Sequence, residues 1–217
     1  MDVNLLQNSR LFQGMSAEEI SSALRSLQAE EKRCKKGQTL LHAGDITEKL
    51  GLVLEGSVTI ESNDAWGNRT ILSHVGRMQL FAETYALLGD EPLLVDAVAN
   101  EDCRVLFLRV GSGQKLLDLS SSWSQKLTVN LLTITSLKNL HLAGRSFHTA
   151  PKTVRGRVMA YLNTVSLQTQ STEFDIPFDR QQLADYLNVE RTALSKELGK
   201  MRDDGLIKTR KSHFTIC

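Results

Sequence analysis

The side chains best suited to specific chemistry in this sequence lie on one polar face of a helix expected over about residues 190–202. Arg191, Thr192, Ser195 and Lys196 follow the helical repeat and lie opposite the apolar positions. An arginine at the start of such a helix can donate two hydrogen bonds to guanine O6 and N7. A lysine about one turn later can reach a base edge or a phosphate. The pattern therefore indicates that this face reads base pairs in a DNA major groove.

Two short helices are needed to hold that face in place, and the sequence carries signals for both. Asp179 and Gln182 are spaced as a capping box at the start of the first helix. Asn188 can adopt the left-handed conformation that a tight turn between helices requires. The apolar faces that would pack the two helices together are Leu183, Ala184 and Leu187 in the first, and Leu194, Leu198 and Met201 in the second. This arrangement predicts a helix-turn-helix.

A basic hairpin is expected after Gly205, where residues 206–216 are typical of a strand, a turn and a second strand that together form a wing. Its cations are Lys208, Arg210 and Lys211. Arg180, near the start of the first helix, suits a backbone phosphate, and the neighbouring Gln181 is included among the expected DNA contacts. The alternative is an ordinary helical hairpin with a solvated outer face.

The distribution of charge favours the DNA-binding interpretation. Residues 1–120 contain 12 Lys and Arg against 17 Asp and Glu, whereas residues 121–217 contain 14 against 8. A basic C-terminal half indicates a polyanionic partner, although such a division also arises by chance.

Composition excludes several other classes of protein. The 217 residues are 41% hydrophobic and 24% charged, which excludes a wholly disordered chain. No apolar run approaches the roughly 18 residues of a membrane span, and the N-terminus lacks the pattern of a secretory signal. The three widely spaced cysteines, Cys34, Cys103 and Cys217, argue against a disulfide framework and a cysteine-ligated metal. We therefore expect a cytoplasmic protein that does not contact a membrane.

The N-terminal part changes from a helical to a strand period. Residues 16–29 predict a helix that opens with a capping box formed by Ser16 and Glu19. Residues 32–109 contain short apolar runs separated by glycines at loop spacing. Such runs predict a sandwich or barrel-like β domain.

A long helix is expected over residues 120–146, between a domain of residues 1–119 and one of residues 147–217. Its apolar residues recur every three or four positions and include Leu127, Leu131, Ile134 and Leu140. This stripe either packs against the β domain or pairs with a second copy of the chain, and both interpretations stay open. Pro151 is expected to begin a further helix, with the polar residues 166–172 as a loop.

Along nearly its whole length the sequence resembles the CRP/FNR (cAMP-receptor-protein/FNR) family of bacterial transcription regulators. The segments that carry the resemblance are residues 36–38, 42–45, 52–58, 81–83, 179–187 and 190–198. The resemblance implies an α+β fold with an N-terminal cyclic-nucleotide-binding-like β-roll (a double-stranded β-helix), a long dimerisation helix and a C-terminal winged helix-turn-helix. It also implies a homodimer on palindromic double-stranded DNA, with RNA polymerase as a further partner.

The sequence departs from this family at both of the family's functional sites. In the recognition helix, Thr192 stands where the family has a glutamate, and Lys196 stands where an arginine is frequent. In the sensor, Glu83 of the family turn is kept and is followed by Thr84, whereas Leu93 and Leu94 replace the Arg-Ser pair that holds a cyclic phosphate. A buried phosphate without such partners is strongly penalised, so we predict no useful affinity for cAMP or cGMP. These four sensor residues remain the expected effector pocket: Glu83, Thr84, Leu93 and Leu94.

The sequence also bears on other sensor chemistries and on other classes of function. The sequence lacks the clustered cysteines of an iron–sulfur member. His74 is the candidate axial ligand of a haem sensor, and Cys34 and Cys103 are candidates for redox sensing. A surface or hydrogen-bonded histidine and buried structural thiols are the favoured interpretations of these residues. No hydrolase, phosphate-loop or zinc-protease motif is present, so we expect no catalytic residues, no metal, no cofactor and no enzyme. A sensor that acts through protein partners stays as the alternative to a DNA-binding regulator.

Overall fold

The computed structural model describes residues 3–63, 69–111 and 121–217. The chain divides into two compact units, Met1–Ser136 and Leu137–Cys217, and the boundary falls inside a long helix, α4. Each unit has its own apolar core, and each is described by itself.

The first unit opens with three short helical segments, which are α1 (Val3–Gln7), the 3-10 helix η1 (Arg10–Phe12) and α2 (Ala17–Ser26). The capping box expected at the start of α2 is confirmed, because Ser16 Oγ accepts from the Glu19 amide and Glu19 Oε2 accepts from the Ser16 amide. The helix ends at Ser26, slightly earlier than its sequence pattern suggests.

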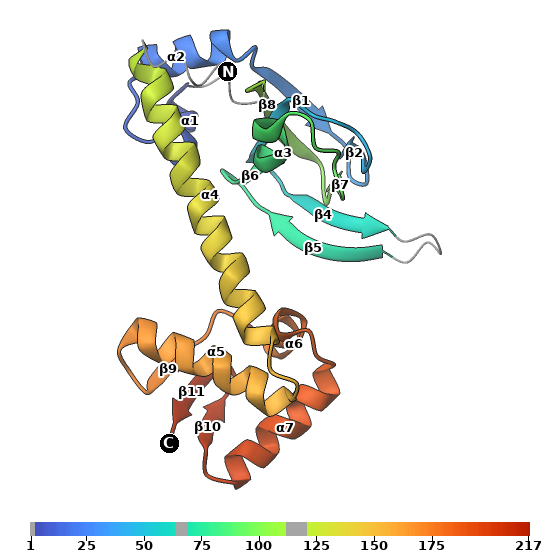
Figure 1. The fold of residues 1–217 in the computed structure, drawn as a ribbon, viewed down its shortest axis with the longest axis vertical. Helices are drawn as coiled ribbons and strands as arrows, with labels where there is room; N and C mark the ends of the chain where they lie inside the picture. The colour runs from blue at the N-terminus through green and yellow to red at the C-terminus, as the bar shows by residue number, and fades with distance from the viewer. Residues whose placement is uncertain (1–2, 64–68, 112–120) are drawn as a thin grey trace. The chain divides into compact units, whose positions relative to one another are not determined.

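Two four-stranded antiparallel sheets follow and form the β-roll that the family resemblance implies (Figure 1). The first sheet has the order β1 (Glu30–Cys34), β8 (Cys103–Arg109), β3 (Lys49–Glu55) and β6 (Leu80–Phe81). The second has the order β2 (Thr39–Leu41), β7 (Asp96–Ala99), β4 (Val58–Asn63) and β5 (Arg69–Val75). A short helix, α3 (Glu83–Leu88), follows β6.

The alternation of side chains along β3 and β8 builds two cores. One face of these strands packs with the N-terminal helices and α4 through Leu50, Leu52, Leu54, Leu106 and Leu108. The other face carries Val53, Val105 and Phe107, which form a second cluster with residues of the second sheet that include Val58 and Val75. Phe81 packs edge-on against Phe107, with ring centroids 5.9 Å apart. The Phe81 ring occupies the space that a side chain at Gly51 would need, which explains the glycine in the middle of β3.

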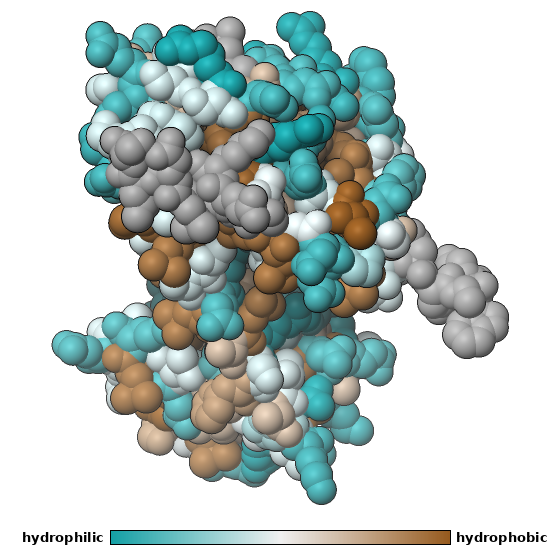
Figure 2. All heavy atoms as spheres, turned by 45° about the horizontal axis from the view of Figure 1, so that its top comes forward, coloured by the Kyte–Doolittle hydropathy of each residue, from teal (hydrophilic) through white to brown (hydrophobic). Residues whose placement is uncertain are grey.

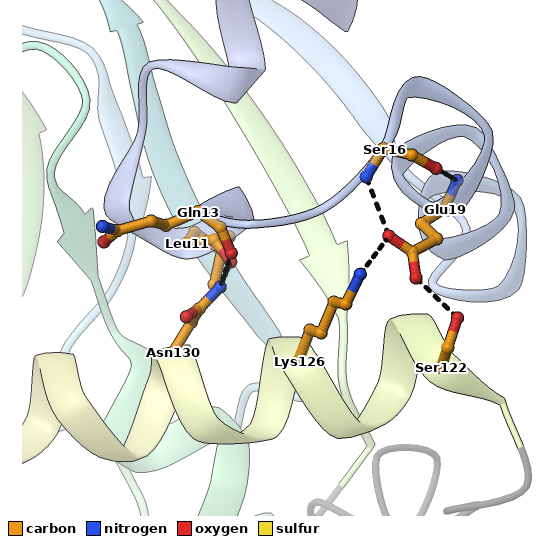
Figure 3. Close-up of polar contacts among 7 residues, drawn as sticks. All are labelled: Leu11, Gln13, Ser16, Glu19, Ser122, Lys126 and Asn130. Atoms are coloured by element: carbon orange, nitrogen blue, oxygen red, sulfur yellow. Dashed lines mark hydrogen bonds and ion pairs between the residues drawn. The ribbon is translucent and has the colours of Figure 1, made fainter.

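The long helix expected over residues 120–146 is observed as α4 (Ser122–Thr149), which continues to Thr149. Its first turns are tied to the N-terminal helices by polar contacts (Figure 3). Glu19 accepts hydrogen bonds from Lys126 Nζ at 2.8 Å and from Ser122 Oγ at 2.5 Å. These contacts, led by the one from Lys126, lower the pKa of Glu19 to about 2. The Asn130 side-chain amide donates to the carbonyls of Leu11 and Gln13, both at 2.9 Å.

The second unit contains the end of α4, three further helices and a small sheet. Its elements after α4 are α5 (Val154–Thr169), β9 (Glu173–Asp175), α6 (Arg180–Leu187), α7 (Arg191–Asp203), β10 (Ile207–Arg210) and β11 (His213–Ile216). The three strands form an antiparallel sheet in the order β10-β11-β9. Two expectations are wrong here: Pro151 precedes α5, which begins at Val154 with Thr153 as its cap, and the helix continues through Thr169 in place of the expected loop.

Candidate nucleic-acid interface

The helix-turn-helix is formed by α6 and α7. The capping box at the start of α6 is observed, because Asp179 Oδ1 accepts from the Gln182 amide and Gln182 Oε1 accepts from the Asp179 amide. Asn188 adopts the left-handed conformation, with φ 52° and ψ 54°, and this residue turns the chain towards α7. The two helices are joined by apolar side chains that are all buried, namely Leu183, Ala184, Leu187, Leu194, Leu198 and Met201.

The polar face of α7 is exposed, because no other part of the second unit covers it. Arg191, Thr192, Ser195 and Lys196 are all exposed on the first two turns of α7. The Thr192 hydroxyl donates to Glu190 Oε1 at 2.6 Å, which orients it back towards the start of the helix. The structure thus brings these four expected contact residues together on one accessible surface.

The wing is the two-residue hairpin between β10 and β11, in which Arg210 pairs with His213 across the strands. Lys211 lies in the turn with φ +54°, and its side chain is exposed, as are those of Lys208 and Arg210. All three expected wing cations therefore point to solvent. His213 on β11 contacts two acidic residues of β9, Glu173 Oε1 at 3.0 Å and Asp175 Oδ1 at 3.2 Å. These contacts raise the pKa of His213, and Glu173 contributes most.

Arg180 takes a different position from the other expected DNA contacts. Its guanidinium is partly buried, donates to Thr209 Oγ1 at 2.7 Å and lies over the Phe214 ring at 5.0 Å from the centroid. Burial lowers the pKa of Arg180. The side chain thereby joins α6 to both strands of the wing. Gln181 is exposed and donates to Asp185 one turn later on α6.

An ion-pair cluster behind α7 has no counterpart in the sequence patterns. Arg155 Nε on α5 lies 2.6 Å from Glu197 Oε1, and its NH1 atom lies 2.7 Å from Asp204 Oδ2. The two acidic partners raise the pKa of Arg155, Glu197 contributing most. Because the pairing joins α5 to the middle and the end of α7, it supports the recognition helix from the side away from its polar face. No local spacing signal could have indicated contacts between residues more than 40 positions apart.

The four residues of the expected effector pocket differ in burial. Glu83 and Leu93 are buried, each with 4% of its surface exposed. Leu93 is fixed by two backbone hydrogen bonds, from its amide to the Asp45 carbonyl and from the Gly44 amide to its own carbonyl. Thr84 is exposed, and Leu94 is 76% exposed, with its amide donating to the Tyr85 hydroxyl at 3.4 Å.

The described residues also bear on metal, membrane and thiol chemistry. No group of three or more metal-ligating side chains gathers there, and no helix among them is long and apolar enough to cross a membrane. All three cysteines are free thiols, with Cys34 and Cys103 buried and Cys217 exposed.

Two family models match the two parts of the chain. The cyclic nucleotide-binding domain matches residues 31–119, and the Crp-like helix-turn-helix domain matches residues 156–217. Together with the β-roll and the winged helix-turn-helix, these matches define a DNA-binding transcription regulator. The chain belongs to the CRP/FNR family.

Relatives with known names support this assignment. The chain is 25% identical over 179 residues to the cAMP-activated global transcriptional regulator CRP of Haemophilus influenzae, a match that covers 78% of this chain and 75% of that protein. The catabolite activator protein of Thermus thermophilus is similar in fold, with a TM-score of 0.50, 24% identity and coverage of 96% and 94%. The c-di-GMP-responsive global regulator CLP of Xanthomonas campestris has a TM-score of 0.58 at 19% identity, with coverage of 93% and 99%.

Proposed function

We propose that this regulator binds a palindromic DNA site as a homodimer and does so without a cyclic nucleotide as effector. The observation that carries the DNA-binding part is the exposed polar face of α7 beside the exposed cations of the wing. Arg191 is placed to contact a guanine, with Ser195 and Lys196 further along the groove. Lys208, Arg210 and Lys211 supply phosphate contacts, which position the domain without reading sequence.

The homodimer is supported by the two apolar faces of α4. One face buries Leu127 and Leu131 in the core of the first unit. At 3.6 residues per turn, the opposite side carries four large apolar residues that are 61–66% exposed, namely Val129, Leu132, Leu140 and Phe147. Their spacing of three and four residues, or multiples of these, suits pairing with the same face of a second copy. Brown apolar side chains also reach the surface among polar ones in Figure 2. The first unit thus covers one face of α4, and we propose that the opposite face pairs with a second copy of the chain.

A substitution on that face tests the dimer. Leu140→Asp places a charge in the proposed interface and should weaken self-association by about tenfold or more, measured by sedimentation equilibrium. Leu167→Asp is the matched control, because Leu167 is 81% exposed at the end of α5, outside α4. Equal self-association of the wild type and Leu140→Asp would rule out this interface.

The effector proposal rests on the loop between α3 and β7. Leu93, which the sequence predicts at the position of the family arginine, is buried, and the charged residues of the loop are Asp90 and Glu91. A cyclic phosphate bound there would lose its hydration without gaining a cation. Phe81 and Phe107 contact each other within the buried apolar cluster formed by residues of both sheets. The name of the CLP relative shows that this fold also serves a different nucleotide, so the fold alone does not fix the ligand.

Selection of binding sites from random duplex DNA tests the proposed function as a whole. The wild-type protein, without added nucleotide, should enrich a palindrome with half-sites about one helical turn apart. Arg191→Ala should enrich the same palindrome with one base position relaxed. Enrichment of no sequence at low salt would contradict the proposal. At a promoter, RNA polymerase is then the expected partner of the bound dimer.

A further inference from the structure

The C-terminal end of α6 is held by two arginines. The last carbonyls of a helix have no partners within the helix and carry the negative end of its dipole. Arg145 Nε donates to the Tyr186 carbonyl at 3.2 Å, and its NH2 atom donates to the Asp185 carbonyl at 3.1 Å. Arg157 NH1 donates to the carbonyls of Leu187 at 3.1 Å and Asn188 at 2.7 Å. Four successive carbonyls are thus bonded by two planar guanidinium groups.

The two arginines come from different elements. Arg145 lies near the end of α4, and its guanidinium also lies over the Tyr186 ring at 5.9 Å from the centroid. Arg157 lies in the first turn of α5, and its Nε donates to the Pro151 carbonyl at 2.9 Å. Arg145 therefore joins α4 to α6, whereas Arg157 joins α5 and the segment before it to the same helix end.

His148 adds a second contact between α4 and α6. Its Nδ1 lies 2.9 Å from the Tyr186 hydroxyl, and its Nε2 lies 2.9 Å from Thr164 Oγ1. The Thr164 hydroxyl proton is already donated to the Ala160 carbonyl at 3.0 Å, so His148 Nε2 is the donor and Nδ1 accepts from Tyr186. The ring is buried and packs edge-on against Tyr161, with centroids 5.4 Å apart. This arrangement fixes the rotation of the last turn of α4 relative to Tyr186.

We infer that Arg145 is a positioning residue through which α4 sets the place of the recognition helix. The carbonyls that it holds belong to the residues just before the Asn188 turn, and α7 begins three residues after that turn. A shift or rotation at the end of α4 is therefore passed to the start of α7 through rigid, two-bond contacts. The inference rests on the proposed dimer, in which α4 determines the spacing of the two recognition helices.

The spacing of the half-sites distinguishes a positioning role from a simple helix cap. A cap stabilises α6, so its loss weakens binding to one half-site and to the palindrome alike. A positioning residue links α6 to α4, so its loss leaves half-site binding intact and relaxes the preference for one half-site spacing. Arg157 provides the comparison, because it caps the same helix end from α5 and not from α4.

The experiment measures the affinity of the full chain for three duplexes at fixed salt: the selected palindrome, the same palindrome with one base pair inserted at its centre, and a single half-site. The variants are Arg145→Met, Arg157→Met and Lys152→Met, the last removing an exposed cation from the segment before α5. In Arg145→Met the ratio of affinities for the two palindromes should fall by about fivefold or more, with half-site affinity within about twofold of wild type. Arg145→Lys keeps the positive charge but not the planar guanidinium that donates two hydrogen bonds. This variant should recover less than half of the spacing preference that Arg145→Met loses.

The other outcomes overturn the inference. If Arg145→Met weakens all three duplexes equally, as Arg157→Met should, Arg145 is only a helix cap. If Arg145→Met behaves like Lys152→Met, the contact has no role in DNA binding. Absence of any spacing preference in the wild type is a distinct result, because it contradicts the proposed dimer on a palindrome, and with it the premise of this inference.

Discussion

The guanidinium of Arg180 lies over the ring of Phe214, 5.0 Å from its centroid, and joins the first helix of the helix-turn-helix to the wing. With the hydrogen bond to Thr209, it fixes the wing cations relative to α7. The position differs from the role expected from the sequence, in which Arg180 contacts a phosphate directly. A residue that supports the wing also affects phosphate binding, so the two roles must be separated by stability as well as by affinity.

Arg180→Ala should therefore lower both stability and DNA affinity. Loss of the ring contact and of one hydrogen bond costs about 1–2 kcal/mol in the free energy of unfolding of the second unit. Thermal melting and DNA titration measure the two effects. Gln168→Ala is the control, because Gln168 is exposed on α5, outside α6, α7 and the wing. Unchanged melting with reduced affinity would assign Arg180 to a direct phosphate contact.

Replacing Arg191 and replacing Lys208 by alanine should weaken DNA binding in different ways. Arg191→Ala should cost about 1–3 kcal/mol in specific binding and relax the preference at one base position. Lys208→Ala should weaken binding to all sequences uniformly and reduce the slope of log affinity against log salt by about 1. Titrations of the selected site and of a scrambled duplex at several salt concentrations distinguish the two. A sequence-independent loss in Arg191→Ala would show that the recognition helix is misassigned.

The helix-turn-helix could be predicted from sequence because its signals are local. The capping box at Asp179, the left-handed Asn188 and the apolar stripe of α7 all lie within a few residues of the contacts that they form. The pairing of β1 with β8 joins residues about 70 positions apart, so the sequence indicates strands but not their order. Contacts such as Arg155 with Glu197 are set by tertiary packing and leave no periodic signal.

The errors in α5 have a similar physical origin. Proline is common at the first position of helices, which is why the sequence indicates Pro151 as the start of α5. The Thr153 hydroxyl instead accepts from the Gly156 amide, and the helix begins at Val154. The polar residues near the end of α5 are compatible with a helix, and the chain leaves it only at Gln170, which adopts the left-handed conformation with φ 53°. The polarity of these residues therefore does not predict the C-terminal end of α5.

Stability should depend on pH through His148. Burial lowers the pKa of His148 below its usual 6.5, so the unfolded chain takes up the proton more readily than the folded one. The free energy of unfolding should therefore fall as the pH falls through about 6.5, with His148 losing its acceptor role towards Tyr186. Denaturant titrations at several pH values, from about 5 to about 8, measure this change in the free energy of unfolding.

A neutral variant isolates this contribution. His148→Gln should flatten the pH dependence, although it also costs some stability at every pH. His213 contributes with the opposite sign, because its raised pKa favours the folded state at low pH, and this contribution is lost as the pH rises through the folded-state pKa. His213→Gln should consequently steepen the loss of stability on acidification. An unchanged slope in His148→Gln would show that this ring is not responsible.

The three thiols should differ in reactivity towards iodoacetamide. Cys34 and Cys103 pair across β1 and β8 and are buried, and burial raises the pKa of both thiols, that of Cys103 to about 11. At pH 7.5 (about one unit below the usual thiol pKa) the exposed Cys217 should be alkylated first, with the other two reacting only on unfolding. Mass spectrometry of the native protein gives the order. Early modification of Cys103 would revive a redox-sensing role for this pair.

The central claim is that a dimer of this regulator recognises a palindrome through α7 without a cyclic nucleotide. Titration of the selected palindrome with the full chain at fixed salt, with and without cAMP, tests it most directly. We predict saturation at two chains per palindrome in the absence of nucleotide, with an affinity that cAMP leaves unchanged. Binding that appears only when cAMP is added would contradict the account. It would show that the sensor binds the nucleotide although the sequence predicts the buried Leu93 at the position of the phosphate-binding arginine.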